Sequence, residues 1–221
     1  MMLLALDTAA ELCAACLWAD GRERGRAVER MRTGHAERLM AVIEAALGEA
    51  GAVYSDVSGI AVSIGPGSFT GIRVGVATAR GLALGLGRPS VGVSTLEAIA
   101  ASVDGGGRPV MVALEGGRGA IHAAVFDAGG AVLRAPASLD LAEAAAWAEA
   151  LSPVLAGNAA PRLAEVLPLP VLATEPTADI AVFSRLGAER LGVGATEKPR
   201  PLYIRPPDAK PQTGGILRQS P

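Results

Sequence analysis

Aromatic residues are scarce in this chain, and neither sign of charge dominates. Phe, Trp and Tyr together make up 3% of the 221 residues, and 20 basic residues stand against 22 acidic ones, for a net charge of −2. A protein that binds nucleic acid unaided usually presents a cationic stripe and stacking rings. The composition therefore argues against self-sufficient nucleic-acid binding, and we expect any role with RNA to be shared with a partner.

Long apolar runs and a secretion signal are also lacking. The most apolar window, 71–87, is shorter than the roughly 20 residues of a membrane span and contains Arg73 and Arg80. The N-terminal segment has no basic residues ahead of its apolar run, which Asp7 and Glu11 interrupt. We expect a cytoplasmic protein without membrane contact. Half of its residues are apolar, enough to build one large domain or two small ones.

Cysteine and histidine occur only twice each, which limits redox and metal chemistry. Cys13 and Cys16 lie in an alternating, strand-like segment, where positions three apart point to opposite faces. We expect them to pack as small hydrophobic residues and not as a redox pair. A metal site on a helix that begins at His35 would need a second ligand at i+4, but that position is Leu39, and His122 lies in the other half of the chain. We therefore expect no histidine-based metal site.

In the first half of the chain, segments with the apolar spacing of a helix alternate with segments with the apolar spacing of a strand. Apolar positions from 36 to 50 recur at helical spacing, with Thr33 as the expected N-cap and Gly51 as the expected stop. Short apolar or alternating runs bounded by turn residues predict strands. The expected strands are 2–8, 12–18, 25–31, 59–64 and 90–93, and the expected helices are 36–50, 71–86 and 95–102.

The second half repeats this order after a Gly-rich joint at 103–109. The expected strands are 109–115, 119–127, 131–137, 153–157 and 170–173, and the expected helices are 141–151, 161–167 and one from a Thr177 cap to Leu191. Two βββαβα units in tandem indicate an α/β protein of two ribonuclease-H-like domains, the duplication found in the actin-like (ASKHA) group. We expect domains at 1–103 and 104–195. The proline-rich tail 196–221 cannot be helical and should form an extended strap.

In the actin-like group, nucleotide phosphates lie between the two halves, at the hairpins that here are 7–11 and 115–119. Asp7 could hold a hydrated Mg²⁺, Thr8 could donate to a phosphate, and Gly116 and Gly117 would let backbone N–H groups approach an anion. The favoured alternative is that Asp7 caps a turn and the glycines close a hairpin. At most a weakly bound ATP or ADP with Mg²⁺ is expected, and no cofactor is required.

The sequence GPGSFTG at 65–71 precedes a helix, so Ser68 and Thr70 could contact a phosphate at the helix N-terminus. It lacks the lysine of a P-loop and follows the fourth strand instead of the first. A capping role is therefore favoured. No acid–base set near Ser68 suggests a hydrolytic triad.

The helix expected at 71–86 has no polar face. Small residues four apart form two ridges that would let another helix approach closely: Gly71, Gly75 and Ala79, and Ala77, Gly81 and Gly85. A helix that is apolar all round must be covered on every side. We expect it to form a subunit interface beside the 36–50 helix, with burial inside the monomer as the alternative.

Several segments together resemble the TsaB (YeaZ) family: LALDTA, GHAERLM, GPGSFTGIRVGVATARGLALG, GVSTLEA and PLYIRPPDAKPQ. The resemblance covers nearly the whole chain, although the second half matches mainly in layout. It implies the actin-like fold and a role in making the N6-threonylcarbamoyl group on adenosine 37 of tRNA. The active site would lie on the paralogue TsaD, with the ATPase TsaE and the enzyme TsaC completing the pathway.

The resemblance also implies that this chain is a degenerate, non-catalytic copy of TsaD. TsaD carries an H-x-x-x-H metal pair where this chain has His35 and Leu39, and relatives usually read D-A-R where it has Glu115, Gly116 and Gly117. The first two long helices would form a homodimer alone and a heterodimer with TsaD, and tRNA would be reached only through the complex. The expected interface residues are His35, Leu39, Ile43, Phe69, Ile72, Arg73, Gly75, Val76, Ala79 and Arg80.

Two other functions remain open. An actin-like ATPase or kinase would need Mg²⁺-dependent turnover, and the 71–86 helix contains no acidic residue to support it. A metallopeptidase of the M22 type would need the missing metal pair.

Overall fold

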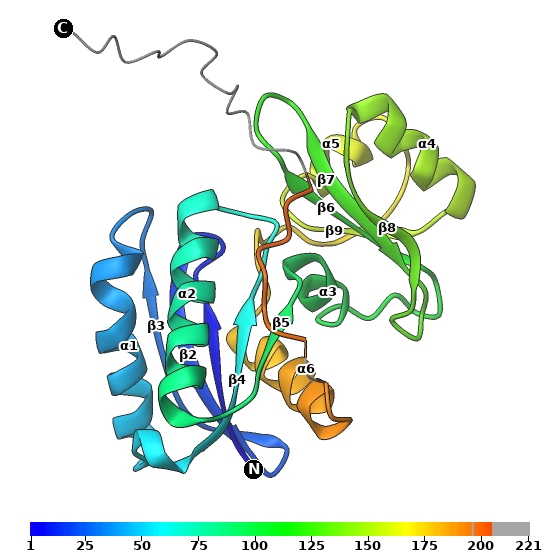
Figure 1. Cartoon of the computed structure of the whole chain (residues 1–221). Coiled ribbons are helices and arrows are strands. Elements are labelled where there is room, and N and C mark those ends of the chain that lie inside the picture. Colours follow the sequence, from blue (N-terminus) through cyan, green and yellow to red (C-terminus); the bar gives the residue numbers. More distant parts are fainter. Residues whose placement is uncertain (196, 205–221) are drawn as a thin grey trace, which may run out of the picture.

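Two five-stranded sheets organise the chain (Figure 1), and the computed structural model describes residues 1–195 and 197–204. The first sheet has the order β3-β2-β1-β4-β5, in which β1, β2 and β3 form an antiparallel meander and β4 and β5 run parallel to β1. Its strands are β1 Met2–Asp7, β2 Leu12–Ala19, β3 Arg22–Arg30, β4 Val57–Ser63 and β5 Ser90–Val93.

The second sheet repeats this pattern with the order β10-β9-β6-β7-β8. Its strands are β6 Val110–Glu115, β7 Ile121–Phe126, β8 Val132–Leu139, β9 Val154–Ala156 and β10 Val171–Ala173. The antiparallel and parallel pairings match those of the first sheet strand for strand. The predicted α/β fold of two tandem βββαβα units is confirmed.

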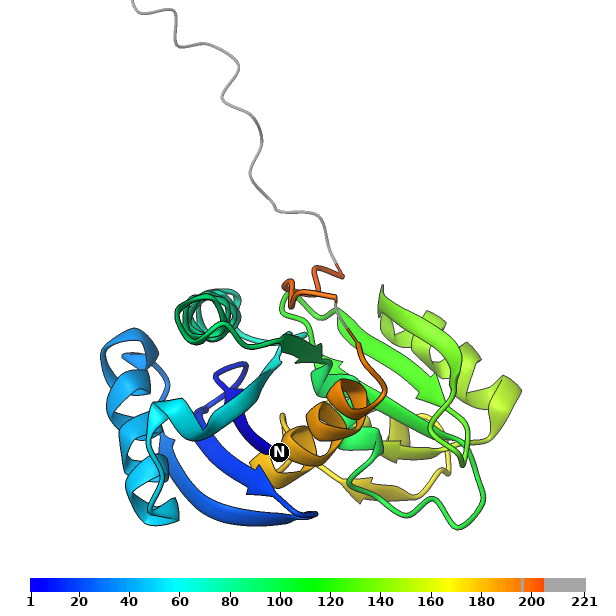
Figure 2. The same cartoon turned by 60° about the horizontal axis from the view of Figure 1, so that its bottom comes forward.

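Six α-helices and one 3₁₀ turn, Tyr54–Asp56, connect the described strands. The helices are α1 His35–Ala50, α2 Phe69–Leu86, α3 Thr95–Ala100, α4 Leu141–Leu151, α5 Ala160–Ala164 and α6 Ile180–Gly192. Helices α1 and α2 cover one face of the first sheet, and α6 covers the other (Figure 2). In α1 the apolar residues at helical spacing face this sheet, because burying that stripe drives the packing.

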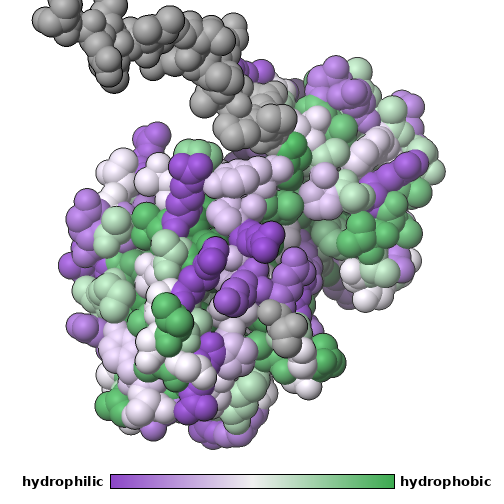
Figure 3. Space-filling model, in the orientation of Figure 1, coloured by the Kyte–Doolittle hydropathy of each residue, from purple (hydrophilic) through white to green (hydrophobic). Residues whose placement is uncertain are grey.

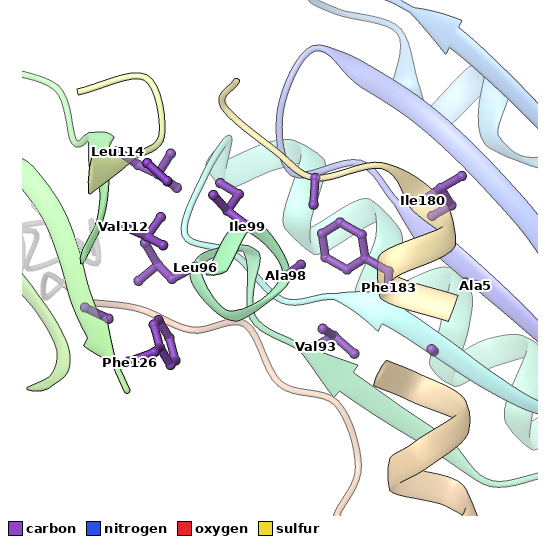
Figure 4. Packing of buried hydrophobic residues seen from close by; sticks show 14 of the residues in the cluster. Ala5, Val93, Leu96, Ala98, Ile99, Val112, Leu114, Phe126, Ile180 and Phe183 are labelled. Atoms are coloured by element: carbon purple, nitrogen blue, oxygen red, sulfur yellow. The ribbon is translucent and has the colours of Figure 1, made fainter. Parts of the chain in front are cut away.

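The last helix of each half packs against the sheet of the other half. Helix α6 contacts the strands of the first sheet, and α3 contacts β6 and β7 of the second. Figure 4 shows one apolar cluster in which Phe183 of α6 lies beside Ala5, and Leu96 and Ile99 of α3 face Val112 on the second sheet. The expected domain boundary near residue 103 remains a prediction, but the two halves share this core.

Two of the predicted helix caps are wrong. Helix α1 begins after Gly34, whose left-handed conformation (φ 91°) turns the chain without a side-chain cap, so Thr33 has no capping role. Helix α6 is capped by Asp179, whose carboxylate accepts from the backbone N–H of Ala181 at 2.8 Å. Thr177, the expected cap, lies two residues earlier. The stop at Gly51 is confirmed, with φ 62°.

Residues 197–204, here called the strap, form no helix or strand and run beside α2 (Figure 1). The N–H of Leu202 donates to the carbonyl of Ile64 at 2.8 Å, just beyond the end of β4. The described part of the tail therefore fits the expected extended strap, and 205–221 lie outside the described residues. Among the described helices, none is both long and apolar enough to cross a membrane.

Candidate functional site

The cleft between the two halves is a hollow of about 580 Å³, and both hairpins expected at a nucleotide site reach it. Glu11 from the first hairpin and Ser68 from the loop before α2 line one side. Glu115, Gly116 and Gly117 line the other. The structure thus brings together three segments that lie far apart in the sequence, as the actin-like order of elements predicts.

Asp7 does not line this cleft and caps a turn through the N–H of Ala9, which is the favoured of its two predicted roles. Its carboxyl is 1% exposed. One oxygen accepts from the N–H of Ala9 at 2.9 Å, and the other accepts from the hydroxyl of Thr177 at 2.8 Å. Burial raises the pKa of Asp7, while hydrogen bonds from Ser63, Ala9 and Thr177 and the nearby His35 oppose that rise. Because both oxygens are engaged and out of contact with water, the residue does not fit a hydrated metal.

The Asp7–Thr177 hydrogen bond joins β1 of the first half to the segment leading into α6, 170 residues away. A second link lies close by, where Arg26 of β3 pairs with Asp179 at 2.5 Å. The sequence predicted Thr177 as a helix cap. A threonine just before a helix can cap that helix or donate to a distant side chain, and the sequence does not distinguish the two roles. These contacts fix α6 on the first sheet.

Thr8 is fully buried and supports α2 instead of facing a phosphate. Its hydroxyl donates to the carbonyl of Gly71 at 2.7 Å. A Cβ at Gly71 would overlap the Thr8 carbonyl, and a Cβ at Gly75 would overlap the Thr8 hydroxyl. The Thr8 hydroxyl is therefore engaged where α2 crosses the end of β1, and this supports the favoured alternative to a phosphate contact.

A cation from α5 contacts the second hairpin, and the sequence did not reveal this contact. Arg162 of α5 pairs with Glu115 at 2.7 Å, and it also donates to the carbonyl of Gly119 at 3.3 Å. Asn158 accepts from the N–H of Glu115 at 3.0 Å. A role for Gly116 in nucleotide binding stays a prediction, in a hairpin whose acidic residue is already paired.

Ser68 has the capping role that the sequence favoured. Its hydroxyl accepts from the N–H of Gly71 at 3.2 Å, and its own N–H donates to Ala9 at 2.6 Å. Gly67 packs so closely on Ala9 that a Cβ there would overlap the Ala9 carbonyl. The loop is therefore held against the first hairpin, with Thr70 exposed beside it.

Much of the expected partner interface is monomer core. The first small ridge of α2 faces inward, because glycine at 71 and 75 lets the helix lie directly on Thr8 and Val62. The expected interface residues that are buried in the described chain are His35, Leu39, Ile43, Ile72, Gly75, Val76 and Ala79. For these residues, the burial favours the alternative of packing inside the monomer, and their part in a partner interface stays a prediction.

The second ridge of α2 is exposed. Ala77, Gly81 and Gly85 face solvent, and a Cβ added at either glycine would meet no atom within 4 Å. Leu84 beside them is 85% exposed. On the neighbouring α1, Met40 is also exposed. An apolar strip across two adjacent helices thus lacks a cover within the described chain.

Three side chains form an exposed cluster at the start of α2. The guanidinium carbon of Arg73 lies 3.6 Å from the ring centre of Phe69 and 5.8 Å from that of Tyr203. Its Nε donates to the Tyr203 hydroxyl at 2.9 Å. Phe69 is 50% exposed and Tyr203 47%. Such stacked arginine–aromatic groups are common at the centres of protein interfaces.

The family model for TsaD, described as tRNA N6-adenosine threonylcarbamoyltransferase, matches residues 27–181, more than half of the chain. The chain belongs to this family. Its relatives include TsaB (YeaZ) proteins. It is 36% identical over 128 residues to the tRNA threonylcarbamoyladenosine biosynthesis protein TsaB of Escherichia coli (strain K12), a match that covers 57% of this chain and 55% of the relative. The chain thus spans about half the length of that curated relative.

Two further likenesses of this TsaD-family chain cover more of its length. An uncharacterized protein of Mycobacterium tuberculosis (strain H37Rv) is 32% identical over 184 residues, covering 80% of this chain and 78% of the relative. The crystal structure of YeaZ from Pseudomonas aeruginosa superposes with a TM-score of 0.79 at 28% identity, covering 91% of this chain and 99% of that one. The fold and the family therefore extend over both halves.

In this TsaD-family chain the first helix lacks the second ligand of the metal pair expected of TsaD. His35 is 7% exposed at the start of α1, and Leu39, one turn on, is buried in the core. In the part of the chain that the structure describes, no three His, Cys, Asp or Glu residues are grouped to hold a metal ion. The residues present therefore do not fit the metal centre.

The two cysteines are buried and unpaired. Burial raises the pKa of Cys13 and of Cys16 to about 11 in each case. A thiol with such a pKa is protonated at neutral pH and reacts slowly. The packing role predicted for both cysteines agrees with their positions in β2.

Proposed function

We propose that this chain is a non-catalytic subunit that dimerises with TsaD and supports the threonylcarbamoylation of adenosine 37 of tRNA. The proposal starts from the names of its relatives, which include both TsaB proteins and TsaD-type transferases. We assign the chemistry to TsaD. We also infer that the chain forms a homodimer when alone, meets TsaE in the complex and reaches tRNA only through it.

The observation that carries the proposal is the uncovered strip of α2 and α1. Exposed small residues such as Gly81 and Gly85 let a second helix approach the α2 backbone closely. Met40 and Leu84 supply apolar surface around them. Exposed apolar and small residues gathered on one surface are typical of a protein–protein interface. We place the TsaD contact here, with Phe69, Arg73 and Arg80 at its edge.

The non-catalytic part of the proposal rests on the cleft. An actin-like ATPase needs a carboxylate that is free to hold a hydrated cation, and Asp7 is engaged by Ala9 and Thr177. A nucleotide entering this cleft would meet mainly backbone groups of the second hairpin. Weak binding of ATP or ADP is compatible with that arrangement, and turnover is not expected.

Gly81→Leu tests the interface directly. The new side chain would fill the space that a partner helix needs, while the monomer should keep its stability, because leucine favours helix over glycine by about 1 kcal/mol at an exposed site. We expect a folded variant that no longer co-elutes with TsaD in size-exclusion chromatography.

Ala146→Leu is the matched control, because it also places leucine at an exposed helical position, on α4, far from the strip. It should co-elute with TsaD as the wild type does. If Gly81→Leu binds TsaD normally while remaining folded, the strip is not the TsaD interface. If the chain hydrolyses ATP without TsaD, the non-catalytic role is wrong.

A further inference from the structure

A second hollow, of about 520 Å³, lies at the C-terminal end of α2. Arg80 of α2, Arg88 of the turn into β5, and Lys198 of the strap line it. Figure 3 shows the face of the molecule on which α2 and the strap lie, and strongly hydrophilic groups gather over its centre. Three cations from three separate segments therefore converge on one hollow.

In the described part of the chain, no acidic residue lines this hollow. The sequence has no Asp or Glu from 57 to 96. Among the described residues, no ion pair joins Arg80, Arg88 or Lys198 to a carboxylate. Other arginines do pair with Asp or Glu, at Arg24, Arg26, Arg38, Arg162, Arg185 and Arg190.

The negative end of the α2 helix dipole offsets only part of the positive charge of these three side chains. A helix C-terminus carries about half a negative charge, which favours a nearby cation. Here the N–H groups of Gly87 and Arg88 already bond to the last carbonyls, of Leu84 and Ala83. Against three full positive charges, the hollow keeps a net positive potential that attracts anions.

The wall of the hollow is apolar as well as cationic. Leu84 is 85% exposed, and Ala83 and Pro89 lie next to it. The volume falls within the range of about 300 to 1,000 Å³ that is usual for small-molecule sites. A ligand that matches both features carries a multiply charged anionic group and an apolar body.

We propose that this hollow binds a small organic phosphate, with the phosphate between Arg80, Arg88 and Lys198 and the apolar part against Leu84. Arginine presents paired N–H donors that fit phosphate oxygens, and lysine adds a point charge. No metal ion is needed, because the protein supplies the positive charge. The site lies outside the cleft between the halves, but it shares Arg80, Gly81 and Leu84 with the strip proposed as the TsaD contact, so the test uses the chain without TsaD.

Isothermal titration calorimetry of the full chain without Mg²⁺ tests the proposal with three probes. ADP carries both the charge and the apolar group, inorganic pyrophosphate carries only the charge, and adenosine carries only the apolar group. We expect ADP to bind most tightly, pyrophosphate more weakly, and adenosine not at all. Added salt should weaken the binding of both ADP and pyrophosphate.

Single variants locate the site. We expect the affinity for ADP to fall about tenfold in each of three variants, Arg80→Gln, Arg88→Gln and Lys198→Gln, because each removes a charge-assisted contact. Leu84→Ser should weaken ADP and leave pyrophosphate unchanged. The control is Arg22→Gln, which removes an exposed arginine of β3 that lines neither hollow, and it should leave both affinities unchanged. Arg32→Gln, in the cleft between the halves, reports on any ligand bound there.

Three results would overturn the proposal. Neither ADP nor pyrophosphate binds at up to about 1 mM. Alternatively, Arg32→Gln abolishes ADP binding while the three hollow variants do not, which would place the ligand in the cleft. Finally, a short single-stranded RNA binds the hollow far more tightly than ADP, which would make it a nucleic-acid contact.

Discussion

Gly75→Ala should destabilise the monomer, although alanine favours helix over glycine by about 1 kcal/mol. The added methyl would overlap the hydroxyl of Thr8 and would lie 3.3 Å from Cγ2 of Val62. Thr8 cannot rotate away without losing its hydrogen bond to Gly71, and an unmade buried hydrogen bond costs about 1 to 3 kcal/mol. Overpacking adds about 1 to 3 kcal/mol. We expect a net loss of about 1 to 5 kcal/mol after the helix gain.

Urea denaturation followed by circular dichroism measures this loss, with Gly81→Ala as the matched control. Gly81 lies in the same helix with open space around it, so alanine there should stabilise by up to about 1 kcal/mol. Thr8→Ala removes the obstructing hydroxyl, and in the double variant Gly75→Ala should cost less than in the wild type. If Gly75→Ala is as stable as Gly81→Ala, the close packing of α2 on β1 is not as described.

Three further outcomes follow from single side chains. The raised pKa of Asp7 means that the folded state binds its proton more tightly than the unfolded state, whose value is near 3.8, so stability from this group is lost as pH rises through the folded pKa. Denaturation curves should show wild type losing stability relative to Asp7→Asn as pH rises above about 4, and parallel pH profiles would contradict this. Cys13 and Cys16, with pKa values of about 11, should react with a thiol reagent at neutral pH only after unfolding; rapid labelling of native protein would exclude their burial. Arg73→Glu should weaken co-elution with TsaD less than Gly81→Leu does, and an unchanged elution profile would remove the cluster at the start of α2 from the interface.

The sequence predicted the order of elements well, because each strand and helix carries its own period and turn residues. It could not predict which sheet α6 would cover, since an apolar stripe does not identify its partner. The two ridges of α2 show the same limit. Gly75 and Gly81 are equivalent in the sequence, but only the sheet beneath Gly75 makes one of them core.

At the site, contacts between side chains that are far apart in the sequence could not be predicted. Asp7 follows an apolar strand, as a metal-binding aspartate would, and only the fold brings Thr177 to it across 170 residues. Arg162 reaches Glu115 in the same way from a separate helix. The Gly-rich hairpin at 116–117 and the Ser68 cap were predictable, because their conformations are set by neighbouring residues.

Reconstituted modification of tRNA tests the central claim most directly. TsaD, TsaE, a source of threonylcarbamoyl-AMP and unmodified tRNA are combined with or without this chain, and threonylcarbamoyladenosine is measured by mass spectrometry. We predict product only when TsaD and this chain are both present, with Gly81→Leu inactive and Ala146→Leu active. Product formed by this chain without TsaD, or formed equally well by TsaD without this chain, would contradict its assignment as a non-catalytic partner.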